Sequence, residues 1–200
     1  MEIWFRTDEF EEATLSLEKV AETSAQIADD LSRWRWLVIS LHNAVQGYMV
    51  LALRGTNNIT VLSPKSAEEW LEAYERGGPY PKYEKLDSFS NLYKKIKSDR
   101  MLMYGHSQKF APQGSQGRSI KKINQFRNEF IHFIPKGWSL EVSGLPQICI
   151  DCLNILEFLG WSSGNVVWRD DQVKTRAEEA IKKAKKHLEE LNKTYNKKTV

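Results

Sequence analysis

Apolar residues recur at helical spacing along almost all of this 200-residue chain. They return every three or four positions, which places them on one face of an α-helix, and they rarely alternate as they would in a strand. This pattern predicts an all-α protein with short irregular connections. Because 41% of the residues are hydrophobic, the chain can bury one core, and we expect a single domain over residues 1–200.

About six or seven helices are expected, arranged as a bundle. The core helices should lie within residues 30–55 and 119–160, where the chain is most apolar. A charged C-terminal helix over 170–193 has a narrow apolar stripe, and we expect it to dock on the bundle, with pairing to a partner helix as the alternative. The expected spans are 8–28, 30–53, 66–77, 87–98, 119–134, 146–160 and 170–193.

The connections are also predicted from composition. Residues 105–119 are rich in Gly, Ser and Gln and form the best candidate for a mobile loop. Such a loop could close over a substrate, and a plain surface loop is the simpler alternative. Residues 138–142 should form a short irregular or extended insert after the 119–134 helix. Disorder is expected only for 192–200.

Charge is distributed unevenly, although the formal net charge is only +3. Residues 1–31 hold nine Asp or Glu against two Lys or Arg, whereas residues 82–136 hold twelve Lys or Arg against four Asp or Glu. Clustered positive charge attracts a polyanion such as RNA through its phosphates. A solvated helical face is the plainer explanation of such a run.

One hexapeptide within the basic region can carry chemistry. It runs from Arg127 through Asn128 to His132, near the end of the expected 119–134 helix. An arginine can bind two phosphate oxygens and stabilise the charge of a phosphoryl-transfer transition state. A histidine can move a proton near neutral pH. Together they could cleave RNA with its 2′-hydroxyl as the nucleophile and without a metal.

The spacing of the pair points to a second copy of the chain. Positions five apart on a helix lie about 140° around its axis, so Arg127 and His132 flank a face instead of stacking on one line. A symmetric dimer could bring both pairs around one cleft. We therefore expect a homodimer. The plainer readings are a capping role for His132 at the helix C-terminus and a surface ion pair for Arg127.

These residues resemble the HEPN superfamily, whose signature is RNxxxH late in a helix of an all-α domain. The resemblance extends to the apolar helices within 30–55 and 119–160. It implies a HEPN-like helical bundle and a metal-independent endoribonuclease with no cofactor. It also implies a toxin–antitoxin, antiviral defence or RNA-processing role, with a neutralising partner protein as a possible regulator. The chain departs from some HEPN toxins at Ile134, where they have a tyrosine that a partner modifies.

The resemblance assigns roles to particular residues. Arg127 would stabilise the phosphate, His132 would transfer the proton and Asn128 would orient the arginine or the phosphate. The RNA backbone would be held by basic residues of the same region, namely Lys109, Arg118, Lys121, Lys122 and Lys136. The alternative function is a non-catalytic HEPN-like module that binds RNA or a protein.

Other features of the sequence favour structural roles or exclude functions. Cys149 and Cys152 lie in an apolar run and are expected to be buried thiols. His42 should be a hydrogen-bonded core residue, His106 a surface residue, and most tryptophans core residues. The chain has no Walker-type loop, no HExxH and no GxSxG. No apolar run approaches the roughly 20 residues that cross a bilayer, so we expect a cytoplasmic protein without membrane contact.

Overall fold

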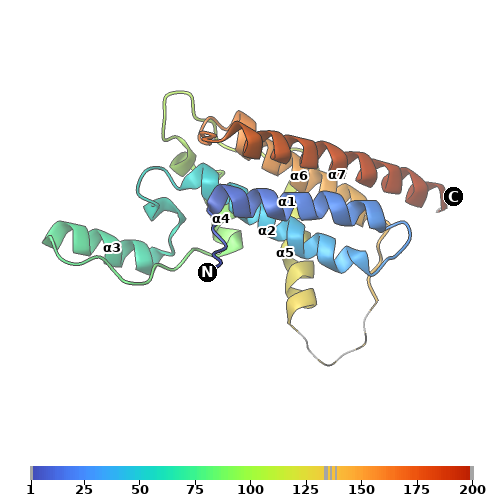
Figure 1. Cartoon of the computed structure of the whole chain (residues 1–200), viewed down its shortest axis with the longest axis horizontal. Helices are drawn as coiled ribbons and strands as arrows, with labels where there is room; N and C mark the ends of the chain where they lie inside the picture. The colour runs from blue at the N-terminus through green and yellow to red at the C-terminus, as the bar shows by residue number, and fades with distance from the viewer. Residues whose placement is uncertain (1, 133–134, 136, 138, 199–200) are drawn as a thin grey trace. The chain divides into compact units, whose positions relative to one another are not determined.

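The computed structural model describes residues 2–132, 135, 137 and 139–198. In these residues it contains seven α-helices and no strand, which confirms the all-α prediction (Figure 1). The helices are α1 (Glu9–Gln26), α2 (Arg33–Leu53), α3 (Pro64–Arg76), α4 (Phe89–Lys95), α5 (Gln116–Ile131), α6 (Leu145–Glu157) and α7 (Asp171–Lys198). Short 3-10 turns at Ile59–Val61 and Asp99–Met101 and a π turn at Phe158–Ser162 complete the helical structure.

These elements divide into two compact units. Unit 1 contains residues 1–47, 112–157 and 168–200, and unit 2 contains residues 48–111 and 158–167. Helix α2 belongs to both units, because its first part lies in unit 1 and its last residues lie in unit 2. The expectation of one domain over the whole chain stays a prediction.

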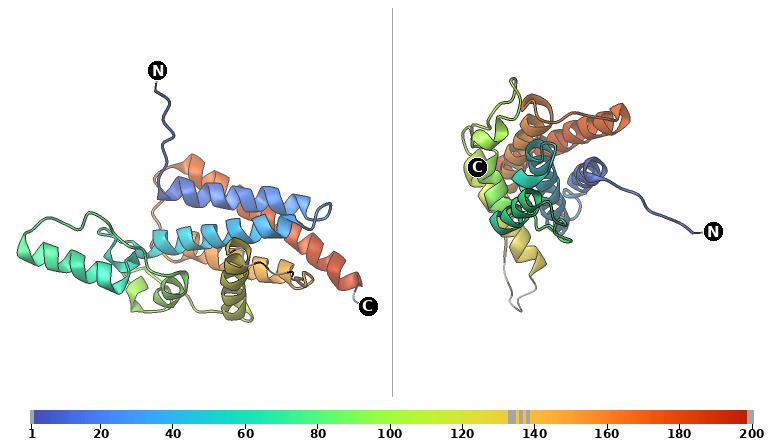
Figure 2. Two further views of the ribbon diagram at one scale, coloured as in Figure 1. Left: turned by 90° about the horizontal axis from the view of Figure 1, so that it is seen from below. Right: turned by 90° about the vertical axis from the view of Figure 1, so that its left-hand side faces the viewer.

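Unit 1 is a bundle built around the C-terminal helix. Helix α7 packs on α1 and on α6, and α6 also packs on α5. Helices α1, α6 and α7 run alongside the first part of α2, and α5 crosses them (Figures 1 and 2). The expected docking of the C-terminal helix is therefore confirmed. Its apolar stripe, which includes Ala177, Ile181, Ala184 and Leu188, is buried.

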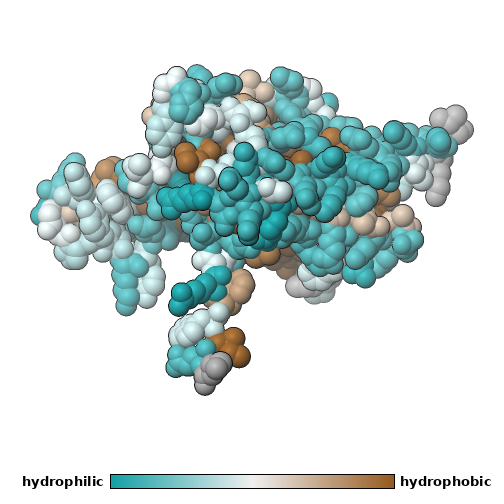
Figure 3. All heavy atoms as spheres, turned by 45° about the horizontal axis from the view of Figure 1, so that its top comes forward, coloured by the Kyte–Doolittle hydropathy of each residue, from teal (hydrophilic) through white to brown (hydrophobic). Residues whose placement is uncertain are grey.

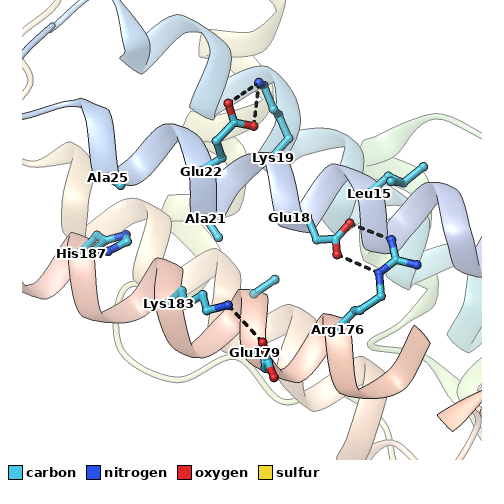
Figure 4. A pocket seen from close by; sticks show the side chains of 11 residues that line it. Leu15, Glu18, Lys19, Ala21, Glu22, Ala25, Arg176, Glu179, Lys183 and His187 are labelled. Carbon is cyan, nitrogen blue, oxygen red and sulfur yellow. Dashed lines mark hydrogen bonds and ion pairs between the residues drawn. The ribbon is translucent and has the colours of Figure 1, made fainter. Parts of the chain in front are cut away.

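An ion-pair network joins α1 to α7 and uses the acidic character of the N-terminal region. The guanidinium of Arg176 donates from Nε and Nη2 to the two oxygens of Glu18, at 2.8 Å each (Figure 4). Its Nη1 donates to Glu11 at 2.8 Å. The hydrogen bonds from Arg176 lower the pKa of Glu18. All three side chains are partly exposed, so screening by water limits what the network adds to stability. The face of the molecule drawn in Figure 3 is mainly hydrophilic.

Capping side chains set the starts of α1 and α3, and some helix ends differ from the predicted ones. Helix α1 begins close to the predicted position, and Asp8 is its N-cap: its carboxylate accepts hydrogen bonds from the N–H groups of Phe10 and Glu11 at 2.9 Å. Helix α3 begins at Pro64, two positions before the expected start, because Ser63 is its N-cap. Helix α7 continues to Lys198, so the expectation of disorder from Asn192 was wrong for residues 192–198.

The loop between α4 and α5 is anchored instead of free. Phe110 is only 5% exposed and its ring contacts those of Tyr93 and Phe158. The N–H of Gln108 donates to the carbonyl of Ser163 at 2.9 Å. The burial of Phe110 could not be predicted from the sequence, because a single buried aromatic residue among polar neighbours gives no periodic signal.

The prediction that most tryptophans are buried holds for some of them and not for others. The insert after α5 is described only in part. Trp34 is buried as expected, but Trp36 is 50% exposed. In the insert, residues 139–142 form neither helix nor strand, and Trp138 lies outside the described residues.

Helix α2 has 21 residues and is mostly apolar, although no apolar segment long enough to cross a membrane was expected from the sequence. By length and composition alone it could cross a bilayer, and 61% of its most apolar window is buried inside the fold. A core helix of a soluble protein passes the same test, so this is weak support for a membrane segment.

Candidate functional site

The last turn of α5 presents the Arg-Asn-His motif. Helix α5 ends at Ile131, and His132 leaves the helical conformation with φ −85° and ψ 99°. The N–H of His132 still donates to the carbonyl of Asn128 at 3.0 Å, which closes the helix end. The side chains of Asn128 and His132 are exposed, and that of Arg127 is half-buried. The motif is thus accessible at a helix terminus, where the sequence predicted it.

The guanidinium of Arg127 is oriented by its neighbour in the chain. Its Nη1 donates to the side-chain oxygen of Asn128 at 3.1 Å. Its Nε is buried and has no hydrogen-bond partner among the described residues. A buried N–H of a cation that lacks an acceptor is costly, and a phosphate oxygen is one acceptor that could satisfy it.

Behind Arg127, α5 is held to α2 by a buried histidine. His42 is 2% exposed, and its Nε2 lies 3.0 Å from the side-chain oxygen of Asn124, one turn before Arg127 on α5. Burial lowers the pKa of His42 to about 4, and the positive charge of Arg127 contributes to the lowering. His42 is therefore neutral at pH 7 and can donate from Nε2 to Asn124. The prediction that it is a hydrogen-bonded core histidine is confirmed.

The first turn of α5 is fixed by a buried carboxylate on α6. Asp151 is 6% exposed, and one of its oxygens accepts hydrogen bonds from the hydroxyls of Ser115 and Ser119, at 2.6 Å each. The other oxygen accepts from Nε2 of Gln147 at 3.0 Å. Together with the buried side chains of Ile120 and Ile123, these contacts set the rotation of α5 on the bundle.

Removal of the charge of Asp151 should weaken this anchor. The variant Asp151→Asn keeps the shape of the side chain but replaces one accepting oxygen by a donating NH2. We expect the free energy of unfolding to fall by about 1–2 kcal/mol, because buried donors lose their acceptor. Urea unfolding followed by circular dichroism measures the change, and the exposed Asp29→Asn is the matched control. An unchanged stability would contradict the anchoring role.

The basic residues assigned to RNA binding are distributed over both units. Arg118, Lys121 and Lys122 are exposed on α5. Lys122 also lies near Glu141, whose pKa is lowered mainly by hydrogen bonds from Ser143 and in part by this lysine. Lys109 belongs to unit 2 and forms an ion pair with Asp99 at 2.9 Å. Lys136 and Ile134 lie outside the described residues.

The structure confirms the structural roles predicted for the cysteines and the surface position predicted for His106. Two residues that support the motif helix were not predicted from the sequence. Cys149 and Cys152 are buried thiols, and burial raises the pKa of each. His106 is exposed. The roles of Asn124 and Asp151 were missed. Asp151 could have been noticed as a single charge within an apolar helical run, but nothing in the sequence connects Asn124 with His42.

In the described part of the chain, no three His, Cys, Asp or Glu side chains come together in a group that could hold a metal ion. Comparison with models of protein families, with curated proteins and with solved structures finds no match.

Proposed function

We propose that this protein is a metal-independent endoribonuclease of the HEPN type, with Arg127 and His132 as its catalytic residues. The observation that carries the proposal is the presentation of Arg127, Asn128 and His132 together at the accessible end of α5. A guanidinium supported by an amide, next to an exposed imidazole, is suited to bind a phosphate and to transfer a proton.

The proposed reaction is an internal transfer of the phosphoryl group within RNA. The 2′-oxygen forms a bond to the adjacent phosphorus while the bond from phosphorus to the 5′-oxygen of the next nucleotide breaks. The proton of the 2′-hydroxyl goes to a neutral imidazole, and the leaving 5′-oxygen takes a proton from an imidazolium. The products are a 2′,3′-cyclic phosphate and a 5′-hydroxyl. The role of Arg127 is to stabilise the charge on the non-bridging phosphate oxygens.

The surroundings of the motif support a site shared by two copies of the chain. The second half of α5 has large apolar side chains that are only half-buried, at Phe126, Phe130 and Ile131. Among its described residues, the fully buried side chains are confined to Ser119, Ile120 and Ile123 in the first half. A second α5 related by a two-fold axis would cover these apolar side chains and supply a second Arg and His.

The basic face of α5 supports RNA as the substrate. Arg118, Lys121 and Lys122 are exposed on the helix that carries the motif, so they could bind the phosphate backbone of RNA. Such contacts give affinity without sequence preference and weaken as salt is added.

Cleavage of RNA by the purified chain tests the proposal. Single-stranded RNA and transfer RNA are incubated with the protein in EDTA, and the termini of the fragments are identified. We expect fragments with 2′,3′-cyclic phosphate and 5′-hydroxyl ends. An RNA with a single 2′-deoxy nucleotide at the cleavage position is the matched control and should resist cleavage there, because it lacks the nucleophile.

Two other results would count against the nuclease. Cleavage of the 2′-deoxy control at the same position would rule out attack by the 2′-hydroxyl. Salt-sensitive RNA binding without cleavage of any RNA would favour the non-catalytic module.

A further inference from the structure

Helix α3 in unit 2 has two faces that differ in their contacts. One face packs against the chain segment that follows the helix. There the ring of Trp70 stacks on that of Tyr80 with centroids 4.9 Å apart, and the hydroxyl of Ser66 accepts a hydrogen bond from the N–H of Lys85 at 3.1 Å. This face fixes α3 in its unit.

The opposite face of α3 lines an open groove of about 580 Å³. The floor of the groove is apolar, and Leu71 at its centre is 45% exposed. Only Ser66 and Ala73 are fully buried among the residues of α3, so the helix keeps an apolar stripe that its own unit does not cover. The apolar lining consists of Ile59, Leu62, Pro64, Ala67 and Leu71.

The two walls of the groove carry opposite charges of unequal strength. Glu68, Glu72 and Glu75 line the α3 wall at positions i, i+4 and i+7, which places them along one side of the helix. Lys95 and Arg100 line the other wall. The charge of Lys95 is already balanced, because its ammonium contacts the buried carboxylate of Asp87 at 2.7 Å.

The charge of the α3 wall is less compensated. Glu72 pairs with Arg76 at 2.7 Å, but Glu68 and Glu75 have no ion-pair partner among the described residues. The groove therefore offers an apolar floor beside a row of carboxylates, with Arg100 as the main uncompensated cation on the far side.

From this arrangement we propose that the groove binds an amphipathic helix of a partner protein, whose apolar stripe is flanked by Lys or Arg on the side facing α3. Leu71 and the partly exposed Ile59 contact the apolar stripe of the partner helix. Glu68 and Glu75 pair with its basic residues. The proposal goes beyond the nuclease function and does not depend on it.

A helix is the occupant that matches the dimensions and the charge spacing of the groove. Helix α3 has 13 residues and is about 20 Å long, which accommodates a partner helix of three or four turns. Basic residues at i, i+4 and i+7 of that helix would face the carboxylates in register, as in other complexes where a helix lies in a groove. RNA is disfavoured here, because the carboxylate row repels phosphate.

Binding of a designed peptide to the full-length chain tests the proposal. The probe is a fluorescein-labelled, lactam-stapled helix of about four turns, with leucines in one stripe and lysines along one flank. Its twin has glutamates in place of the lysines. Fluorescence anisotropy should show saturable binding of the lysine peptide with a dissociation constant on the order of 10 µM. Binding of the twin should be at least about tenfold weaker.

Variants of the groove make the test specific. Leu71→Asp should weaken binding of the lysine peptide by about tenfold. The double variant Glu68→Lys with Glu75→Lys should reverse the preference and bind the glutamate twin. The matched control is Glu69→Lys, since Glu69 is on α3 but does not line the groove, and it should leave binding unchanged. Circular dichroism and the midpoint of thermal unfolding verify that each variant is folded.

The remaining outcomes overturn the proposal. These are equal binding of the two peptides, no saturable binding of either, or an effect of Glu69→Lys as large as that of the double variant. A loss of RNA binding by Leu71→Asp with peptide binding retained would assign the groove to RNA. Peptide binding is measured without RNA, so a chain that fails to cleave RNA can still pass this test.

Discussion

Replacement of Arg127 by alanine is expected to reduce RNA cleavage by about a thousandfold, because the transition state loses a charged donor that binds its phosphate oxygens. His132→Ala should have a similar effect, since proton transfer by a positioned side chain contributes about a hundredfold to ten-thousandfold. Single-turnover cleavage at saturating protein measures both losses. Arg127→Lys should recover little activity, because an ammonium cannot form the two parallel hydrogen bonds of a guanidinium.

The matched control for this pair is Arg118→Ala, which removes a positive charge from the first turn of the same helix. It should weaken RNA binding and leave the rate of the bound complex nearly unchanged. If Arg127→Ala only weakened binding in the same way, the catalytic role would be refuted and Arg127 would be one more phosphate contact.

A mixture of the two inactive variants tests whether the site is shared. A heterodimer of Arg127→Ala and His132→Ala chains retains one Arg and one His around the common cleft. We expect part of the activity to return on mixing when the residues come from different protomers. No recovery, despite subunit exchange shown by sedimentation or mass spectrometry, would place a complete site in each chain.

The second large effect is on stability and comes from the buried His42. Its pKa is lowered from 6.5 to about 4 in the folded protein. Between these values the unfolded chain binds a proton that the folded chain does not bind, so folding stability rises with pH over this range. On acidification from pH 7 to pH 4, His42 alone should reduce the free energy of unfolding by about 3 kcal/mol.

Urea unfolding at a series of pH values, compared with the variant His42→Gln, measures this contribution. Glutamine has an amide N–H that can replace the donor to Asn124 but has no proton to gain. The loss of unfolding free energy between pH 7 and pH 4 should therefore be smaller by about 3 kcal/mol in the variant. Equal pH dependence in both proteins would show that His42 is not held neutral by the fold. An NMR titration of Arg127→Ala adds a check, since loss of that positive charge should raise the pKa of His42.

The helices were predictable because their signals are local. The periodic spacing of apolar residues predicted all seven helices. The start of α1 was predicted closely, and its cap is also local, because Asp8 accepts from the N–H groups two and three positions later. Helix boundaries were predicted wrongly where they do not depend on apolar periodicity. At α3, for example, Ser63 and Pro64 begin the helix before the expected start. The buried Phe110 was missed for the same reason.

The positions of the motif residues along the chain came from the sequence by itself, and so did their place at the end of a helix. Their surroundings were decided by the tertiary structure. The contact of His42 with Asn124 joins residues 82 positions apart, and Asp151 lies 32 and 36 positions from the serines that it holds. The groove along α3 likewise combines residues from α3, α4 and both neighbouring 3-10 turns. Helical periodicity identifies which face of a helix is buried, but packing between distant segments determines what that face meets.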